Sequence, residues 1–175
     1  MASVKSYRRH SKLWNKPKNP FEKKRMEKEI ILIVQFGLKN KRELWKIQLF
    51  LSKIRNTARK IIGIDIKHHS VSNLCYNIIW FCYKYNLIIE SNNSIESILS
   101  ISIKDLLTRR FQSLVYKFAL SRTIHEARLI INHKYIEING QISNKPGLLV
   151  KKDNEKYMHF SKKYLNITCL SIHKN

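Results

Sequence analysis

The sequence is organised around the stretch from Arg109 to Gly140, which reads RRFQSLVYKFALSRTIHEARLIINHKYIEING. Apolar residues recur in it at three- and four-residue steps, and this spacing predicts two short helices. Thr123 with Glu126 forms a capping box that predicts the start of the second helix. Asn139-Gly140 follows alternating residues and favours a type I′ hairpin turn. Because the basic residues fall off the apolar faces, the stretch is typical of a compact RNA-binding module.

Charge is the strongest signal outside this stretch. The 175 residues carry 34 Lys and Arg against 12 Asp and Glu, a net charge of +22. Residues 1–60 hold 18 basic and 4 acidic side chains (+14), residues 61–108 hold 3 and 4 (−1), and residues 109–175 hold 13 and 4 (+9). Such an excess of positive charge favours a polyanionic partner, and a nucleic acid is the leading candidate. The distribution predicts two separate phosphate-facing surfaces joined by a nearly neutral structural segment.

Residues 1–19 show no periodicity and interleave basic residues with Tyr7 and Trp14. We expect a basic RNA-threading arm, including Arg8 and Arg9, that folds on RNA; a disordered tail and a transit peptide are the alternatives. The three cysteines lack a CxxC spacing, which favours a reducing compartment. No apolar run approaches the roughly 18 residues that a membrane span needs, so no membrane partner is expected.

Two capped helices are expected to follow the arm. Asn19 and Glu22 predict a first helix that begins at Pro20 and ends at Gly37. Its apolar face is expected to consist of Met26, Ile30, Ile33 and Val34.

The second helix is expected to run from a capping box of Asn40 and Glu43 to Gly63. Its apolar face is predicted at Leu44, Ile47, Leu51, Ile54, Ala58 and Ile61. A basic stripe lies away from that face and consists of Arg42, Lys46, Lys53 and Lys60. A solvated surface is the plain alternative, but no acidic residue balances the stripe, so we favour phosphate contact.

The nearly neutral middle of the chain is expected to be structural. An apolar and aromatic pattern from Val71 to Ile89 predicts a buried helix with Cys75 and Cys82 as core thiols. A zinc site that combines these cysteines with His68 and His69 is disfavoured, because adjacent histidines followed by cysteines seven residues apart make a poor tetrahedral site. We expect no metal and no cofactor.

Towards the C-terminus, Ser102 with Asp105 predicts the start of one helix that continues to Phe118. After the hairpin, short strands are expected at Leu148–Val150 and Tyr157–Phe160. The expected fold class is α+β, with an N-terminal helical domain and a small RNA-binding domain of two helices packed on a short antiparallel β-sheet. The expected division is an arm (1–19), the helical domain (20–107 with 161–175) and the RNA-binding domain (108–160).

The stretch resembles the RNA-binding domain named after the fourth protein of the small ribosomal subunit. The resemblance is carried by Arg109-Arg110-Phe111-Gln112, Ser121-Arg122-Thr123, Ala127-Arg128, Ile131-Asn132-His133 and Ile138-Asn139-Gly140. Upstream, two segments resemble the eukaryotic form of the ribosomal protein itself. They are Pro20-Phe21-Glu22-Lys23 and Gly37-Leu38-Lys39-Asn40-Lys41-Arg42-Glu43-Leu44-Trp45. The similarity covers about residues 17–165. It identifies the sequence as a member of the universal small-subunit ribosomal protein four family, called protein nine in eukaryotic numbering.

The resemblance implies a structural, non-enzymatic constituent of the small ribosomal subunit. It implies binding to the 5′ domain of small-subunit ribosomal RNA (rRNA) during assembly, and a place near the channel where messenger RNA (mRNA) enters. The implied partners are rRNA, neighbouring small-subunit proteins and mRNA, with no small-molecule substrate. The implied location is the cytosolic ribosome, after assembly in the nucleolus.

The residues at the family's RNA-facing positions are Arg109, Arg110, Gln112, Ser121, Arg122, Thr123, Arg128, His133 and Lys134. Among them, Arg109 and Arg110 are expected to project from the helix pair. The expected RNA-binding set is completed by Lys117, Lys23, Lys24, Arg25, Lys41, Arg42, Lys46, Lys53, Lys60, Arg8 and Arg9.

The sequence departs from the family in several places, among them residues 68–77, which match poorly, and Gly147, where the family usually has serine after the proline. Family members usually have glycine near Phe118-Ala119, and eukaryotic members carry a basic, glycine-rich C-terminal extension that is missing here. An RNA-modifying enzyme or a stand-alone RNA chaperone with the same domain remains the alternative. The sequence shows neither a Gly-rich phosphate loop nor a paired-carboxylate site, which argues against the enzyme.

Overall fold

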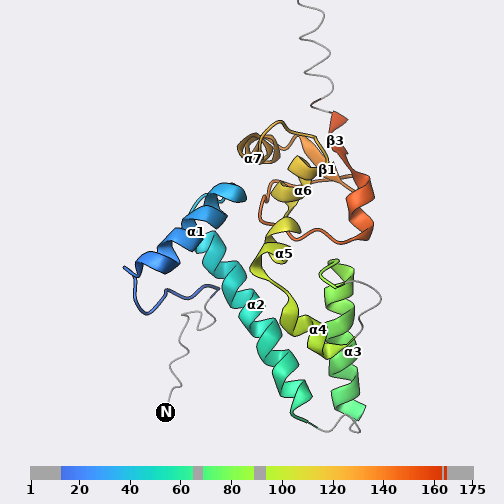
Figure 1. The fold of residues 1–175 in the computed structure, drawn as a ribbon. Helices are drawn as coiled ribbons and strands as arrows, with labels where there is room; N and C mark the ends of the chain where they lie inside the picture. The colour runs from blue at the N-terminus through green and yellow to red at the C-terminus, as the bar shows by residue number, and fades with distance from the viewer. Residues whose placement is uncertain (1–12, 65–68, 89–93, 163, 165–175) are drawn as a thin grey trace, which may run out of the picture.

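The computed structural model describes residues 13–64, 69–88, 94–162 and 164. In this part of the chain, helices precede a small antiparallel sheet, which confirms the α+β fold class (Figure 1). The elements are α1 (Lys23–Gln35), α2 (Lys41–Ile62), α3 (His69–Lys84), α4 (Ile95–Ser100), α5 (Ile103–Thr108), α6 (Phe111–Lys117), α7 (Ile124–Asn132), β1 (Ile136–Ile138), β2 (Gln141–Ile142), the 3-10 helix η1 (Asp153–Tyr157) and β3 (Met158–Phe160).

Helix α1 differs from the expectation at its start and on its buried face. It begins at Lys23, because Pro20 lies in a turn, so the predicted start at Pro20 is wrong. Ile30 and Val34 were expected to be buried but are 52% and 65% exposed, whereas Glu29 is 3% exposed. The face that packs is formed by Leu32, Ile33 and Phe36. The sequence spacing placed the apolar face wrongly, because the neighbouring helix offers polar partners to Glu29.

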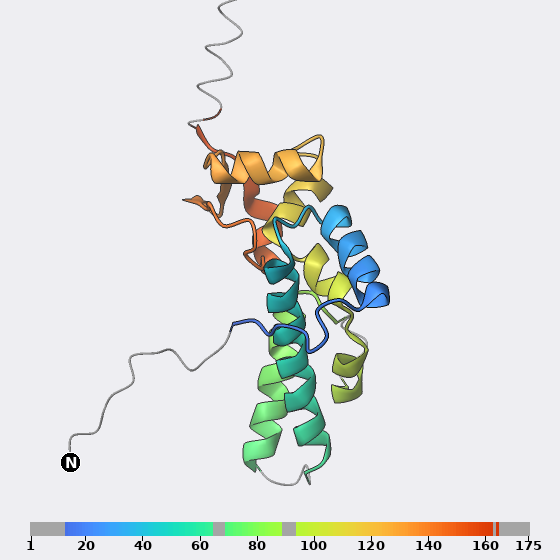
Figure 2. The ribbon, with the colours of Figure 1, turned by 90° about the vertical axis from the view of Figure 1, so that its left-hand side faces the viewer.

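Helix α2 has the expected bounds, but its capping box is only half formed, because the Glu43 carboxylate binds Arg110 and Arg128. The Asn40 side chain accepts a hydrogen bond from the Glu43 N–H at 3.2 Å, and the helix is followed by Gly63. Its buried residues are Leu44, Leu51, Ala58 and Ile61. Figure 2 shows α2 as the long axis of the molecule, with α3 beside its C-terminal half.

Helix α3 is buried on one side only, so the expectation of a buried helix holds for Ile78, Ile79 and Cys82 but is wrong for Leu74. Cys82 is fully buried in the core shared with α2, α4 and α5, whereas Cys75 is partly exposed. The side chains of Leu74, Tyr76 and Trp80 are exposed. The residues after Ile88 in the predicted helix fall outside the described part of the chain.

The single helix expected from Ser102 to Phe118 is broken into α5 and α6. The capping box of Ser102 and Asp105 is confirmed, but Arg110 has an extended backbone (φ −70°, ψ 144°) and forms a β-bridge with Leu149. The Phe111 N–H donates to the Leu148 carbonyl at 2.7 Å. Backbone groups of residues 109–112 therefore form hydrogen bonds with loop 146–150, where a continuous helix would have bonded them within itself. The strand expected at Leu148–Val150 is reduced to this bridge.

The small domain contains the confirmed features of the opening stretch. The capping box of Thr123 and Glu126 is present, and Asn139 and Gly140 both have positive φ, as a type I′ turn requires. The sheet has the order β2-β1-β3, with both pairs antiparallel. Its core consists of Phe111, Leu114, Val115, Ala127, Ile131, Ile136, Ile138 and Val150.

The residues after β3 pack on the small domain where the structure describes them. The Ser161 N–H donates to the Tyr135 carbonyl at 2.8 Å, and the Tyr164 ring stacks on Phe160 with centroids 4.6 Å apart. Both residues belong to the segment 161–175 that was expected in the helical domain, and residues 163 and 165–175 of that segment lie outside the described part of the chain. No described helix combines the length and apolarity needed to cross a membrane.

Candidate nucleic-acid interface

Glu43 on α2 joins the helical N-terminal half to the small domain. Its carboxylate accepts hydrogen bonds from Arg110 Nη2 at 2.9 Å and from Arg128 Nη2 at 2.6 Å. Arg128 Nη1 also lies 3.3 Å from the second carboxylate oxygen. Burial raises the pKa of Glu43, but the hydrogen bond from Arg128 and the charge of Arg110 lower it more, so its pKa lies below the usual value. This carboxylate is therefore ionised at neutral pH and holds two cations.

Gln112 and Gly37 complete this contact, which we call the junction (Gly37, Glu43, Arg110, Gln112 and Arg128). The buried Gln112 amide donates to the Gly37 carbonyl at 3.0 Å and to the Ile124 carbonyl at 2.9 Å. Gly37 has φ +57°, and a Cβ there would lie 2.8 Å from Gln112 Nε2. Gly37 is thus required both for its backbone conformation and for the close approach of Gln112.

Arg109 and Arg110 do not project from the helix pair, so that expectation is wrong. They are 6% and 2% exposed. Arg109 pairs with Glu155 on η1 and donates to the Val150 carbonyl at 3.2 Å. Burial lowers the pKa of Arg110, and Glu43 opposes that shift. Arg109, Arg110 and Gln112 are buried, and their side chains bind carboxylate or carbonyl oxygens of residues distant in sequence. All three therefore occupy structural positions.

The remaining predicted residues divide by exposure. The exposed ones are Lys117, Arg122, Thr123, His133, Lys134, Lys23, Lys24, Arg42, Lys46, Lys53 and Lys60. The partly buried ones are Arg25, Lys41, Ser121 and Arg128, while Arg8 and Arg9 lie outside the described residues. Contact of any of these residues with RNA stays a prediction.

A cavity of about 380 Å³ beside the junction connects the two basic blocks. Lys46 of α2 lines it together with Lys145 and Gly147 of the loop between β2 and η1, and the junction arginines also line it. The blocks were expected to be separated by the neutral segment, but the junction puts them in direct contact. Lys145 was not among the site residues predicted from the sequence. The turn residues Pro146 and Gly147 beside it were the one signal that could have pointed to an exposed basic loop here.

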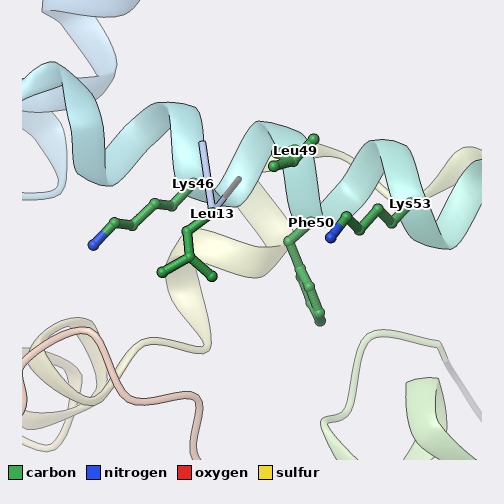
Figure 3. Close-up of a pocket in the computed structure, with 5 residues that line it drawn as sticks. All are labelled: Leu13, Lys46, Leu49, Phe50 and Lys53. Atoms are coloured by element: carbon green, nitrogen blue, oxygen red, sulfur yellow. The ribbon is translucent and has the colours of Figure 1, made fainter. Parts of the chain in front are cut away.

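The basic stripe of α2 is exposed along its length, as the sequence predicted. Figure 3 shows Lys46 and Lys53 on either side of Phe50, with Leu13 lying against the helix between them. A cavity of about 240 Å³ is lined by the two lysines and by Leu13, Leu49 and Phe50. The stripe thus combines cations with apolar surface.

Residues 13–20 lie against α2. The Trp14 ring stacks on Trp45 with centroids 5.8 Å apart, and the Arg42 guanidinium lies 5.3 Å from the Trp14 centroid. Figure 2 shows this segment crossing α2 before α1 begins. This end of the expected arm is therefore a packed part of the basic surface.

The described residues contain no group of three or more His, Cys, Asp or Glu side chains placed to hold a metal ion. Burial raises the pKa of Cys82 to about 11, which keeps it a protonated thiol. His68 lies outside the described residues, so the disfavoured zinc set is described only in part.

No protein-family model matches this chain. The chain is similar to the small ribosomal subunit protein uS4 of Trypanosoma brucei brucei. The two sequences are 31% identical over 158 residues, which cover 90% of this chain and 83% of the trypanosome protein.

Proposed function

Because this chain belongs to the uS4 family of small-subunit ribosomal proteins, we propose that it is a structural component of the small subunit that binds rRNA. One observation carries the mode of binding: Lys46 and Lys145, from the two basic blocks, line one cavity beside the junction. A phosphate backbone that crosses this cavity contacts both blocks at once. RNA then binds the chain as one continuous basic surface.

The proposed contacts are the exposed basic residues of α2 and of the small domain. Their side chains suit phosphate oxygens, and the net charge of +22 favours release of counterions from RNA. Arg109, Arg110 and Gln112 support these contacts by fixing the orientation of the small domain. We place the bound RNA in the 5′ domain of small-subunit rRNA.

The finer location follows from the same proposal. We place the chain near the channel where mRNA enters, with neighbouring small-subunit proteins and mRNA as further contacts. Its ribosome is the cytosolic one, and assembly begins in the nucleolus. Sedimentation of a tagged chain with small subunits in a gradient supports this placement, whereas sedimentation with unbound protein alone contradicts it.

A binding experiment tests the RNA surface. The affinity for an rRNA 5′-domain transcript is expected to fall by roughly 10³–10⁵ between 50 and 200 mM salt, if about eight phosphates are contacted. The Lys46→Ala/Lys145→Ala variant is expected to bind more weakly, with a salt slope smaller by about 0.7–0.9 per lost contact.

The matched control is Lys28→Ala/Lys104→Ala, which removes the same charge from exposed positions outside the proposed set. It is expected to retain a larger salt slope than the cavity variant. Equal slopes for the two variants, or a wild-type affinity that does not change with salt, would contradict the proposal.

A further inference from the structure

Four aromatic rings contact one another in a row on the small domain, where α7 leads into β1 and β3 pairs with β1 (Figure 1). The His133 ring stacks on Tyr135, with centroids 5.6 Å apart and 19° between the ring planes. Tyr135 contacts Tyr164 at 5.0 Å, and Tyr164 stacks on Phe160 at 4.6 Å. We call these four residues the aromatic ladder. Phe160 packs against the core of the small domain, and His133 is the exposed end.

The backbone holds the exposed end of the ladder in place. His133 is the C-cap of α7, and the next residue, Lys134, has a positive φ of 62°. The N–H groups of Lys134 and Tyr135 donate to the carbonyls of Ile131 and Ile130 at 3.0 and 3.2 Å, which closes the end of the helix. A ligand therefore meets rings that are already ordered, and binding loses less conformational entropy.

The outer face of the His133 ring is available to a ligand. Tyr135 covers the inner face, and the His133 side chain is exposed. Within the described part of the chain, the imidazole forms no hydrogen bond or ion pair and contacts no second ring. An aromatic ring with one covered and one exposed face can extend its stack by one more flat ring.

Exposed lysines adjoin the ladder in the sequence. Lys134 directly follows His133, and Lys162 lies two residues after Phe160. The nearest acidic residue along the chain is Glu137 in β1. Aromatic rings beside exposed cations are the combination that binds single-stranded nucleic acid, because the rings stack on bases while the cations contact phosphates.

We propose that the aromatic ladder stacks one unpaired RNA base on the outer face of His133, with Lys134 in contact with a neighbouring phosphate. A base inside a duplex is covered on both faces by its neighbours, so the ladder takes its base from a loop, a bulge or an end. Every base has a flat π-face, so the contact accepts any of the four. The inference rests on the proposed RNA-binding function and adds a stacking contact to its phosphate contacts.

Photocrosslinking locates the contact on the full chain. The probe is a single-stranded uridine hexamer with one 5-iodouracil, a base that crosslinks to aromatic side chains on which it stacks. Mass spectrometry is expected to find an adduct at His133 in the wild type. His133→Phe is expected to form an adduct at the same position, because it keeps a flat ring. Lys134→Ala is expected to keep the adduct and to reduce the salt slope of hexamer binding by about 0.7.

The affinity for the single-stranded hexamer, divided by that for a duplex of the same sequence, separates stacking from general attraction to phosphates. In His133→Ala this ratio is expected to fall roughly fivefold, at the lower end of what one base stack contributes. His133→Asn, which is polar but has no aromatic ring, is expected to behave like His133→Ala. His133→Phe is expected to keep the wild-type ratio.

His159→Ala is the matched control, because His159 is exposed in β3 and stacks on no ring of the described residues. It is expected to keep the wild-type ratio. The absence of an adduct at His133 in the wild type overturns the inference without any variant. A folded His133→Ala with an unchanged ratio overturns it too, even if that variant enters small subunits less well, since the ring then contacts a protein.

A His133→Phe ratio as low as that of His133→Ala also overturns the inference, because the contact would then be polar. Salt-dependent binding of the rRNA transcript by the wild type, measured in parallel, leaves the proposed function intact in all these cases. Loss of that binding removes both proposals.

Discussion

Replacing Glu43 by glutamine tests the junction directly. Glu43 Oε1 and Oε2 hold Arg128 and Arg110, and the Arg110 side chain is 2% exposed. Removing one partner of a buried ion pair costs about 3–5 kcal/mol, because the remaining charge is left uncompensated. We take the lower end, about 3 kcal/mol, because the glutamine carbonyl still accepts one hydrogen bond and Glu43 is partly exposed. For a chain of this length, the melting temperature should fall by roughly 6–12 °C.

The pH dependence provides an independent check. Because the folded-state pKa of Glu43 is depressed below its ordinary value of 4.5, the stability from its charge is present above that value. It is lost as the pH falls through the folded-state pKa. The gap between wild type and Glu43→Gln should therefore be largest at pH 7 and narrow below about pH 4.5.

Urea denaturation followed by circular dichroism at each pH measures this gap, with the exposed Glu27→Gln as the control of equal charge change. Glu27→Gln should lie within about 0.5 kcal/mol of wild type at every pH, as surface substitutions usually do. A Glu43→Gln variant as stable as the control at pH 7 would refute the reasoning that the junction orients the small domain.

Two further predictions concern the backbone and the core. Ala119 has φ +55°, in the left-handed region that favours glycine, so Ala119→Gly should raise the melting temperature by about 2–4 °C. Ala127→Gly in α7 should lower it. A lower melting temperature for Ala119→Gly would contradict this reasoning. Burial raises the pKa of Cys82 to about 11 from an ordinary 9.0, so little of this thiol is ionised at pH 8. In a Cys75→Ser/Cys169→Ser variant at pH 8, Cys82 should therefore react with a disulfide reagent about a hundredfold more slowly in the folded chain than in the unfolded chain. Comparable rates in the two states would show that Cys82 is accessible.

Local signals succeeded where no distant partner competes for the side chains. The capping boxes of Ser102 and Thr123 both form, whereas the one expected at Asn19 and Glu22 does not begin α1, and the one at Asn40 is only half formed because Glu43 binds two arginines. The Asn139-Gly140 turn also needs no distant partner, because its φ angles and the two adjacent strands lie within a few residues. These signals correctly gave the starts of α5 and α7 and the hairpin turn.

The failures arose where a partner is distant in sequence. Arg110 was expected to be exposed because it lies off a helical face, but its partner Glu43 is 67 residues away. Glu29 is buried for the same reason, since Trp45 donates to it from the next helix. Ile30 shows the opposite error. Its helical spacing predicted burial, but no described element covers that face and the side chain is exposed. Helical spacing alone could not reveal which face the neighbouring elements cover.

The junction also has a consequence for the order in which the chain folds during synthesis. Its contacts join residues separated by 67 positions at Arg110, 75 at Gln112 and 85 at Arg128. At about 5–20 residues per second, the codon for Arg128 is translated roughly 4–17 s after that for Glu43. Until Arg110 has been translated, α2 can pair with α1 while Glu43 still lacks both of its cations. The junction is therefore a late contact of high sequence separation, and its closure fixes the relative orientation of the two basic blocks.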